Sequence, residues 1–221
     1  MGATERTRVK ICCIASVAEA RLAVARGAGA LGLVSSMPSG PGPIPEARIA
    51  EIAATVPPGI ASFLLTSRTD AGAIVAQQRR CRVDTIQLCD ALDDDAHGGL
   101  RAELPGIALV QVVHVTGEDA VDQARAVAPR VDAILLDSGE PALPLKELGG
   151  TGRVHDWAIS RRIVEAVGVP VYLAGGLDAD NVAEAIRRVR PFAVDLCTGV
   201  RTDGRLDAGK LGAFFAAVAN G

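Results

Sequence analysis

The sequence has few aromatic residues: Phe, Trp and Tyr together make up 3% of its 221 residues. Nucleic-acid binders usually need rings on which bases can stack, and they need a basic face for the phosphate backbone. The formal net charge at pH 7 is −3, and no long basic run occurs. We therefore expect no nucleic-acid partner.

Paired cysteines and long apolar runs are also missing. The five cysteines, at positions 12, 13, 81, 89 and 197, form no Cys-x-x-Cys pair and no regular framework, which argues against a disulfide-rich secreted domain. The segment Met1–Arg6 has no apolar signal core, and no apolar run reaches membrane-spanning length. We expect a protein of a reducing compartment, the cytoplasm, with no membrane partner.

What the sequence does have is an alternation of short apolar runs with helical stretches, repeated about eight times. Continuous apolar runs are typical of strands buried on both faces, and strand–helix alternation predicts a parallel sheet. The expected strands are Val9–Ile14, Ala30–Val34, Ile60–Leu65, Val83–Leu88, Ala108–Val113, Val131–Leu136, Val169–Ala174 and Ala193–Cys197. The expected helices are Val17–Arg26, Glu46–Thr55, Ala71–Arg80, Asp93–Glu103, Glu118–Val127, Ile159–Val167, Asn181–Val189 and Ala208–Val218. The fourth is weaker, because Gly98-Gly99 interrupts it.

Eight such units in a chain of this length predict a closed (β/α)8 barrel rather than an open sheet. No linker rich in Pro, Gly or Ser divides the chain, so we expect one domain over residues 1–221. Two longer loops, Ser35–Pro45 and Ser138–Asp156, follow the second and sixth expected strands. They leave the strand ends at which barrel enzymes carry out their chemistry, although long connectors would look the same.

Glycine clusters follow three consecutive strands, the sixth, seventh and eighth. Backbone N–H groups exposed in such turns form an anion site, and barrels commonly bind phosphate in this region. An arginine beside such a motif can pair with phosphate or carboxylate, although a solvated surface side chain is the alternative. We expect phosphate or substrate binding by Gly150, Thr151, Gly152, Arg153, Gly175, Gly176, Gly199, Val200 and Arg201.

Two ionisable groups end strands on the opposite side of the expected mouth. Asp137 closes the sixth strand and can lend a proton, and Cys12 near the end of the first strand can remove one from carbon as a thiolate. Each has a plainer interpretation: Cys12 as a small buried hydrophobic residue, and Asp137 as a cap or a loop salt bridge.

The motif Lys10-Ile11-Cys12 resembles the N-terminal Lys-Ile-Cys-Gly of phosphoribosylanthranilate isomerases. Further matches span nearly the whole barrel. They are Gln87-Leu88, Leu136-Asp137, Gly149-Gly150-Thr151-Gly152, Asp156-Trp157, Leu173-Ala174-Gly175-Gly176-Leu177, Asn181-Val182, Val194-Asp195 and Gly199-Val200.

The resemblance implies an Amadori rearrangement in tryptophan biosynthesis, in which phosphoribosylanthranilate becomes carboxyphenylamino-deoxyribulose phosphate without a metal or organic cofactor. It implies that Cys12 is the general base at C2′ and Asp137 the general acid at the furanose oxygen, and that the glycine loops hold the phosphate. We expect a phosphorylated small-molecule substrate and a monomer or homodimer.

The chain departs from the family pattern at four places. Cys13 replaces a glycine, Cys89-Asp90 replaces His-Gly, and Cys197-Thr198-Gly199-Val200-Arg201 replaces Ser-Ser-Gly-Val-Glu. The loop Ser35–Pro45 lacks the family's Arg, which orients the intermediate; Arg153, the better candidate, or Arg201 could compensate. The main alternative is therefore a non-catalytic or differently specific phosphosugar-binding barrel.

A metal or redox site is a second alternative, because cysteines and His114 lie near strand ends. No zinc-like ligand spacing occurs, and successive strand residues point to opposite sides, so we expect Cys12 and Cys13 not to chelate together. A single histidine is more often a polar residue with hydrogen-bond partners in the protein than a ligand contact, and this applies to His114 and His155.

Overall fold

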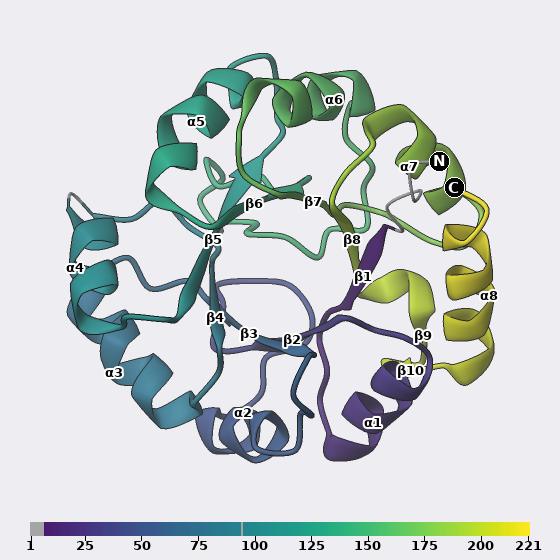
Figure 1. Ribbon diagram of the computed structural model, residues 1–221, viewed down its shortest axis with the longest axis horizontal. Helices are drawn as coiled ribbons and strands as arrows, with labels where there is room; N and C mark the ends of the chain where they lie inside the picture. The colour runs from purple at the N-terminus through teal and green to yellow at the C-terminus, as the bar shows by residue number, and fades with distance from the viewer. Residues whose placement is uncertain (1–6, 94) are drawn as a thin grey trace.

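The computed structural model describes residues 7–93 and 95–221, so the segment Met1–Arg6 lies outside the described residues. Eight parallel strands close into a barrel in chain order, surrounded by helices (Figure 1). The predicted (β/α)8 fold is confirmed. The strands are β1 Arg8–Ile11, β2 Ala30–Val34, β3 Ala61–Thr66, β4 Thr85–Leu88, β5 Ala108–His114, β6 Ala133–Asp137, β7 Val171–Leu173 and β8 Ala193–Leu196. The helices are α1 Val17–Ala25, α2 Glu46–Ala53, α3 Ala71–Cys81, α4 Ala96–Glu103, α5 Ala120–Val127, α6 Trp157–Ala166, α7 Val182–Val189 and α8 Ala208–Val218.

Several helices begin where a polar side chain caps the first turn. Ser16 accepts from the Glu19 N–H, Asp70 from that of Ala73, and Asp156 from that of Ala158. Each cap satisfies a backbone donor that has no partner inside the helix. Helix α4 has no such cap, which agrees with its weaker sequence pattern. In the described part of the chain, no helix has the length and apolar character needed to cross a bilayer.

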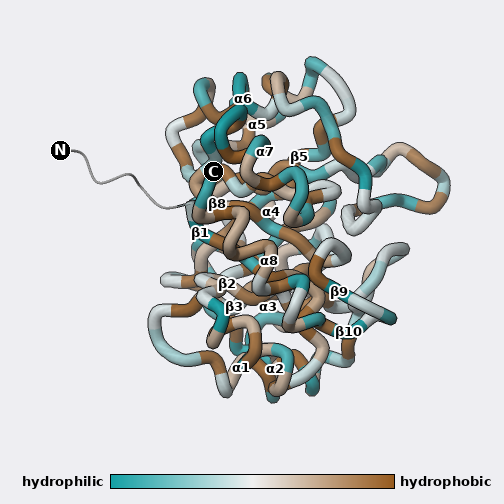
Figure 2. The backbone as a smooth tube through the Cα atoms, turned by 90° about the vertical axis from the view of Figure 1, so that its right-hand side faces the viewer, coloured by the Kyte–Doolittle hydropathy of each residue, from teal (hydrophilic) through white to brown (hydrophobic). Residues whose placement is uncertain are grey.

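A short hairpin, β9 (Arg201–Thr202) and β10 (Arg205–Leu206), lies between β8 and α8 and was not predicted. Its strands are two residues long, too short to give an alternating pattern. The turn Asp203-Gly204 has positive φ at both residues, as a tight hairpin needs. In side view the hairpin lies at the end of the barrel opposite the C-terminus (Figure 2).

The apolar core has two parts. The larger part fills the layer between the strands and the helices, and the smaller part fills the barrel interior with side chains such as Phe63, Val110, Leu135 and Tyr172. Both faces of each strand are therefore buried, which explains the continuous apolar runs in the sequence.

A buried ion pair joins the first strand to the last. In the register of β1 with β8, Lys10 lies opposite Asp195, and the Lys10 Nζ is 2.8 Å from a carboxylate oxygen of Asp195. The ammonium group also lies 5.2 Å from the centre of the Phe63 ring. Lys10 is completely buried, so each charge depends on the other for compensation.

We predict that Lys10→Met lowers the free energy of unfolding by about 3–5 kcal/mol, because it leaves a buried carboxylate without a partner. The double variant Lys10→Met/Asp195→Leu should recover most of this loss. Urea unfolding followed by circular dichroism measures it, with Arg79→Met, which breaks an exposed pair with Glu103, as the control. Equal, small effects of Lys10→Met and Arg79→Met would contradict the prediction.

Candidate active site

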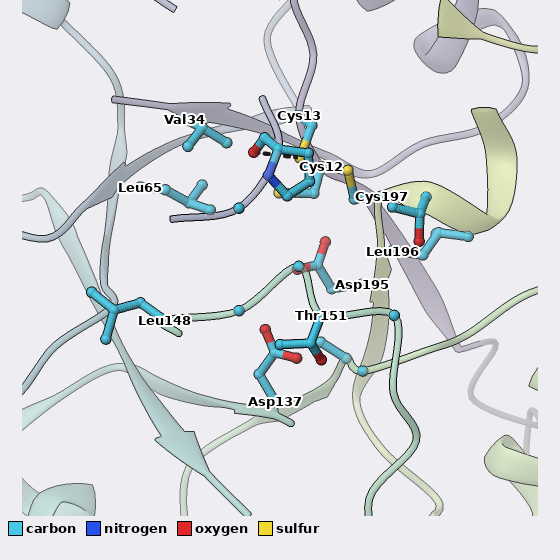
Figure 3. Close-up of a pocket in the computed structure, with 18 of the residues that line it drawn as sticks. Cys12, Cys13, Val34, Leu65, Asp137, Leu148, Thr151, Asp195, Leu196 and Cys197 are labelled. Atoms are coloured by element: carbon cyan, nitrogen blue, oxygen red, sulfur yellow. Dashed lines mark hydrogen bonds between the residues drawn. The ribbon is translucent and has the colours of Figure 1, made fainter. Parts of the chain in front are cut away.

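A pocket opens at the C-terminal ends of the barrel strands (Figure 3). Cys12 and Asp137 both line it and lie on opposite sides of its opening. The glycine segment Gly149–Gly152 and the pair Gly175-Gly176 line it as well. The structure therefore brings together two ionisable groups and two of the three glycine clusters that the sequence singled out.

Cys12 follows β1 directly, at the place where β1 pairs with β8 and closes the barrel. Its backbone N–H donates to the Leu196 carbonyl at 2.8 Å, which continues the pairing of β1 with β8. The Cys12 thiol passes close over Gly32 of β2: a Cβ at that glycine would lie 2.8 Å from the Cys12 Sγ and 3.1 Å from the Lys10 Nζ. Only glycine leaves room there for both side chains. Gly32 is a site residue that the sequence analysis missed.

Asp137 ends β6, and its carboxyl group is almost completely buried. Burial and, to a smaller extent, the negative charge of Asp195 raise its pKa to about 6, against the backbone hydrogen bond from Ser138 and the charge of Lys10, which lower it. The Ser138 N–H donates to Oδ1 at 2.7 Å and fixes the orientation of the carboxyl group. A carboxyl with such a pKa can carry a proton near neutral pH, as a general acid must.

The loops after β6 and β7 pack tightly against each other. Ser138 Oγ donates to the Arg153 carbonyl at 2.5 Å, and it lies 3.0 Å from Thr151 Oγ1. Gly176, with φ of +61°, approaches this loop so closely that a Cβ would lie 2.9 Å from the Gly152 carbonyl oxygen. The glycine there serves both a left-handed turn and a close backbone approach.

Not every expected binding residue reaches the pocket. Thr198 lines it after β8, whereas the neighbouring Gly199 and Val200 do not, and Val200 is completely buried. Thr198, Gly199 and Val200 form a short 3-10 turn that carries the chain from β8 into β9. Participation of Gly199 and Val200 in ligand binding stays a prediction.

The two arginines that we expected near the phosphate do not line the pocket. Arg201 pairs with Glu19 and donates to the carbonyls of Cys12 and Cys13, and its side chain is 8% exposed. Arg153 pairs with Glu147 and is 56% exposed. Either guanidinium would have to leave a carboxylate to meet a ligand, so their role in binding also stays a prediction.

The loop after β2 folds over the pocket and meets the loop after β6. Ser39 Oγ donates to the Lys146 carbonyl at 2.7 Å, and Pro43 pairs with Val34 in an isolated bridge. Among the described residues that line this pocket, none is Lys or Arg. The pocket wall thus carries carboxyl groups, thiols and backbone amides.

Our expectation that Cys12 and Cys13 point to opposite sides is wrong, because both line the pocket. Strand β1 ends at Ile11, so the strand alternation stops before these residues. Cys13 has a left-handed backbone with φ of +60°, a conformation in which glycine is favoured. The signal was present in the sequence, since the isomerase family has glycine at this position.

Neither His114 nor His155 lines the pocket, in agreement with their interpretation as polar residues that do not contact the ligand. His114 Nε2 lies 3.1 Å from the Cys89 carbonyl oxygen, and burial lowers the pKa of the imidazole. Burial lowers the pKa of His155 to about 4, and its Nε2 lies 2.8 Å from Ser160 Oγ. Within residues 7–93 and 95–221, no three His, Cys, Asp or Glu side chains are grouped as metal ligands.

Comparison with known proteins agrees with the geometry. The family model described as N-(5'phosphoribosyl)anthranilate (PRA) isomerase matches residues 9–217. A relative named N-(5'-phosphoribosyl)anthranilate isomerase from Halorubrum lacusprofundi is 40% identical over 213 residues, which are 95% of each chain. One of the same name from Methanocella arvoryzae is 35% identical over 90% of this chain and 91% of its own.

Solved structures give the same result. Phosphoribosyl anthranilate isomerase from Thermotoga maritima has a TM-score of 0.82 at 27% identity, with 96% of this chain and 98% of that chain covered. The enzyme from Thermus thermophilus has a TM-score of 0.81 at 26% identity, with the same coverage. The chain therefore belongs to the N-(5'-phosphoribosyl)anthranilate isomerase family.

Proposed function

We propose that this single barrel domain converts phosphoribosylanthranilate into carboxyphenylamino-deoxyribulose phosphate, a step of tryptophan biosynthesis, in the cytoplasm. The observation that carries the proposal is the position of Cys12 and Asp137 on opposite sides of one pocket at the strand ends. The names of the relatives support the same substrate.

Asp137 acts as the general acid. It donates its proton to the furanose oxygen as the bond from that oxygen to C1′ breaks, and an open-chain iminium forms. Its raised pKa of about 6 supports this role, because part of the population holds the proton near neutral pH. The contact with the Ser138 N–H keeps the carboxyl directed at one position.

Cys12 acts as the general base. As a thiolate it takes the proton from C2′ of the iminium, and the electron pair moves to nitrogen to give an enol-amine, which tautomerises to the ketone. The contact of Cys12 with Gly32 and the hydrogen bond of its backbone to Leu196 support a fixed position for the sulfur. Fixed positions of both groups lower the entropic cost of the two proton transfers.

The substrate phosphate binds at the corner formed by the loops after β6, β7 and β8. Gly152, Gly175, Gly176 and Thr198 line that corner of the pocket, and backbone amides and a hydroxyl can hold an anion without a lysine or arginine. We propose that Gly199 joins them when ligand binds. Arg201 supports this corner from behind, through the carbonyls of Cys12 and Cys13.

A binding protein for phosphosugars without catalysis is the second candidate. The observation that favours it is the lack of a Lys or Arg among the described residues that line the pocket, since a cation would pair with the phosphate or carboxylate of the substrate. Turnover of phosphoribosylanthranilate by the purified wild type, followed by the loss of substrate fluorescence, decides between the two. Binding of a phosphosugar without turnover would establish the second.

Removing either proton-transfer group should lower turnover. We predict that Cys12→Ala and Asp137→Asn each lower kcat by roughly 10²–10⁴-fold, because each removes one acid–base group. Steady-state kinetics on folded protein measures this, with Cys81→Ala, on helix α3 outside the pocket, as the control. Near-wild-type kcat in either folded variant would overturn the assignment of that residue.

The pKa of Asp137 predicts how stability changes with pH. The folded protein keeps this proton up to about pH 6, whereas the unfolded chain releases it near 3.8, so the folded state binds more protons between these values. Wild-type stability should therefore fall, relative to Asp137→Asn, as pH rises from 4 to 6, by about 2 kcal/mol. Urea unfolding at several pH values tests it, with the exposed Asp122→Asn as the control. A difference that does not depend on pH would contradict the raised pKa.

The two arginines should behave differently when each is replaced by Met. Arg201→Met should lower the free energy of unfolding by about 3 kcal/mol, because it leaves Glu19 partly buried and unpaired. Arg153→Met should cost about 1 kcal/mol or less, because its pair is exposed.

If Arg153 takes over from the missing cation, its loss should lower kcat more than phosphosugar affinity. Unchanged kcat in Arg153→Met would show that the reaction proceeds without it.

A further inference from the structure

Three cysteines lie on one wall of the pocket. Cys12 and Cys13 follow β1, and Cys197 follows β8, its neighbour in the barrel. Ile11 is opposite Leu196 in the register, so the residues that continue the two strands lie side by side. Figure 3 shows the sulfur of Cys13 beside that of Cys197, with Cys12 next to them.

The backbone of Cys13 directs its thiol to Cys197. Its left-handed conformation turns the side chain out of the strand alternation, and its sulfur lies beside those of Cys12 and Cys197 (Figure 3). Its Sγ also lies 3.7 Å from the Pro41 carbonyl oxygen, on the loop that covers the pocket. All three cysteines are free thiols in the structure.

The two thiols differ in reactivity. The neighbouring Cys13 thiol and the charge of Arg201 lower the pKa of Cys197, against burial, which raises it. The neighbouring thiols of Cys12 and Cys197, together with burial, raise the pKa of Cys13. Cys197 is also partly exposed, whereas Cys13 is buried. The thiolate is the form of cysteine that reacts with peroxide, so Cys197 is the sulfur that reacts first.

We propose that Cys197 and Cys13 form a peroxide-sensitive dithiol that closes into a disulfide on the pocket wall. The Cys197 thiolate attacks hydrogen peroxide, which breaks the O–O bond and, with one proton, gives a sulfenic acid and water. Cys13 then attacks this sulfur, and the sulfenic oxygen leaves as a second water. In total, two thiols and one peroxide give one disulfide and two waters.

The other cysteines are less suited to this chemistry. Cys89 is buried in the barrel interior, where burial raises its pKa far above the ordinary range. Cys81 lies on α3, where burial raises its pKa to about 11. Neither lies against a second thiol in the way that Cys13 lies against Cys197.

The disulfide would couple oxidation to the site. It would join the turn after β1, which carries Cys12, to the turn after β8, which carries the phosphate corner with Thr198. It would also remove the Cys13 thiol hydrogen that is donated to the Pro41 carbonyl. We expect kcat to fall by roughly 10-fold or more, because small displacements of a catalytic group have effects of that size. This consequence depends on the proposed function, whereas the disulfide itself does not.

Peptide mapping by mass spectrometry tests whether the disulfide forms. Reduced wild-type protein is treated with one equivalent of hydrogen peroxide, digested without reduction and examined by mass spectrometry. We expect a cross-linked peptide that joins the Cys12-Cys13 segment to the Cys197 segment and that dithiothreitol releases. The cross-link should vanish in Cys13→Gly, which suits the left-handed backbone, and in Cys197→Ser, and it should persist in Cys81→Ala.

Other outcomes would overturn the proposal. A cross-link that survives in Cys13→Gly would assign the partner to Cys12, and sulfinic or sulfonic acid at Cys197 without a cross-link would show that Cys13 does not react. Circular dichroism of each variant establishes that it is folded. Kinetics of the cross-linked and re-reduced protein then test the loss of kcat, and full activity of the cross-linked form would overturn the coupling. Because mapping needs no substrate, a protein without isomerase activity would still test the disulfide.

Discussion

The buried ion pair between Lys10 and Asp195 is the interaction on which the electrostatics of the site depend. It lies in the barrel interior, where β1 meets β8 and the sheet closes. Burial lowers the pKa of Lys10, but the charge and hydrogen bond of Asp195, together with the nearby Cys12 and Cys13, more than offset this and raise it above the ordinary range. The lysine therefore stays charged, and its charge and that of Asp195 act on everything else inside the barrel.

The charges of Lys10 and Asp195 both change the pKa of the Asp137 carboxyl group. After burial and the Ser138 hydrogen bond, Asp195 and Lys10 have the largest influence on its pKa, and they act in opposite directions. Lys10 Nζ also shares the space above Gly32 with the Cys12 thiol. The Lys10–Asp195 pair, which lies where β1 meets β8, thus contributes to the electrostatic environment of both Cys12 and Asp137, the residues to which we assign proton transfer. This arrangement places charges in a core at a cost in stability, as functional sites commonly do.

The sequence predicted the barrel because the fold depends on a local pattern repeated eight times. Most strand boundaries differ by one to three residues, since apolar runs extend beyond the ends of the strands, as Cys12 does after β1 and Ala174 after β7. Cys12 and Asp137 could be placed together because parallel strands end at the same face, whatever the details of packing. The glycine loops after β6 and β7 followed from the same rule.

What the sequence could not supply depends on register and on partners far along the chain. The pairing of Lys10 with Asp195 requires knowing which residues of β1 and β8 lie opposite each other. The ion pair of Arg201 with Glu19 joins the β9 hairpin to α1, and no local pattern indicates it. Cys13 was misplaced because strand alternation was extended past Ile11, where β1 ends.

The central claim is that the barrel interior raises the pKa of Asp137 to about 6, so that part of the population holds the proton near neutral pH. NMR titration of the protein labelled with 13C at the aspartate carboxyl carbons tests this most directly, with Asp137→Asn used to assign the resonance. The account predicts a midpoint of about 6 for Asp137, and a lower midpoint in Asp195→Asn, because the opposing negative charge is gone while Lys10 remains. A midpoint near 4 in the wild type, unchanged by Asp195→Asn, would contradict it.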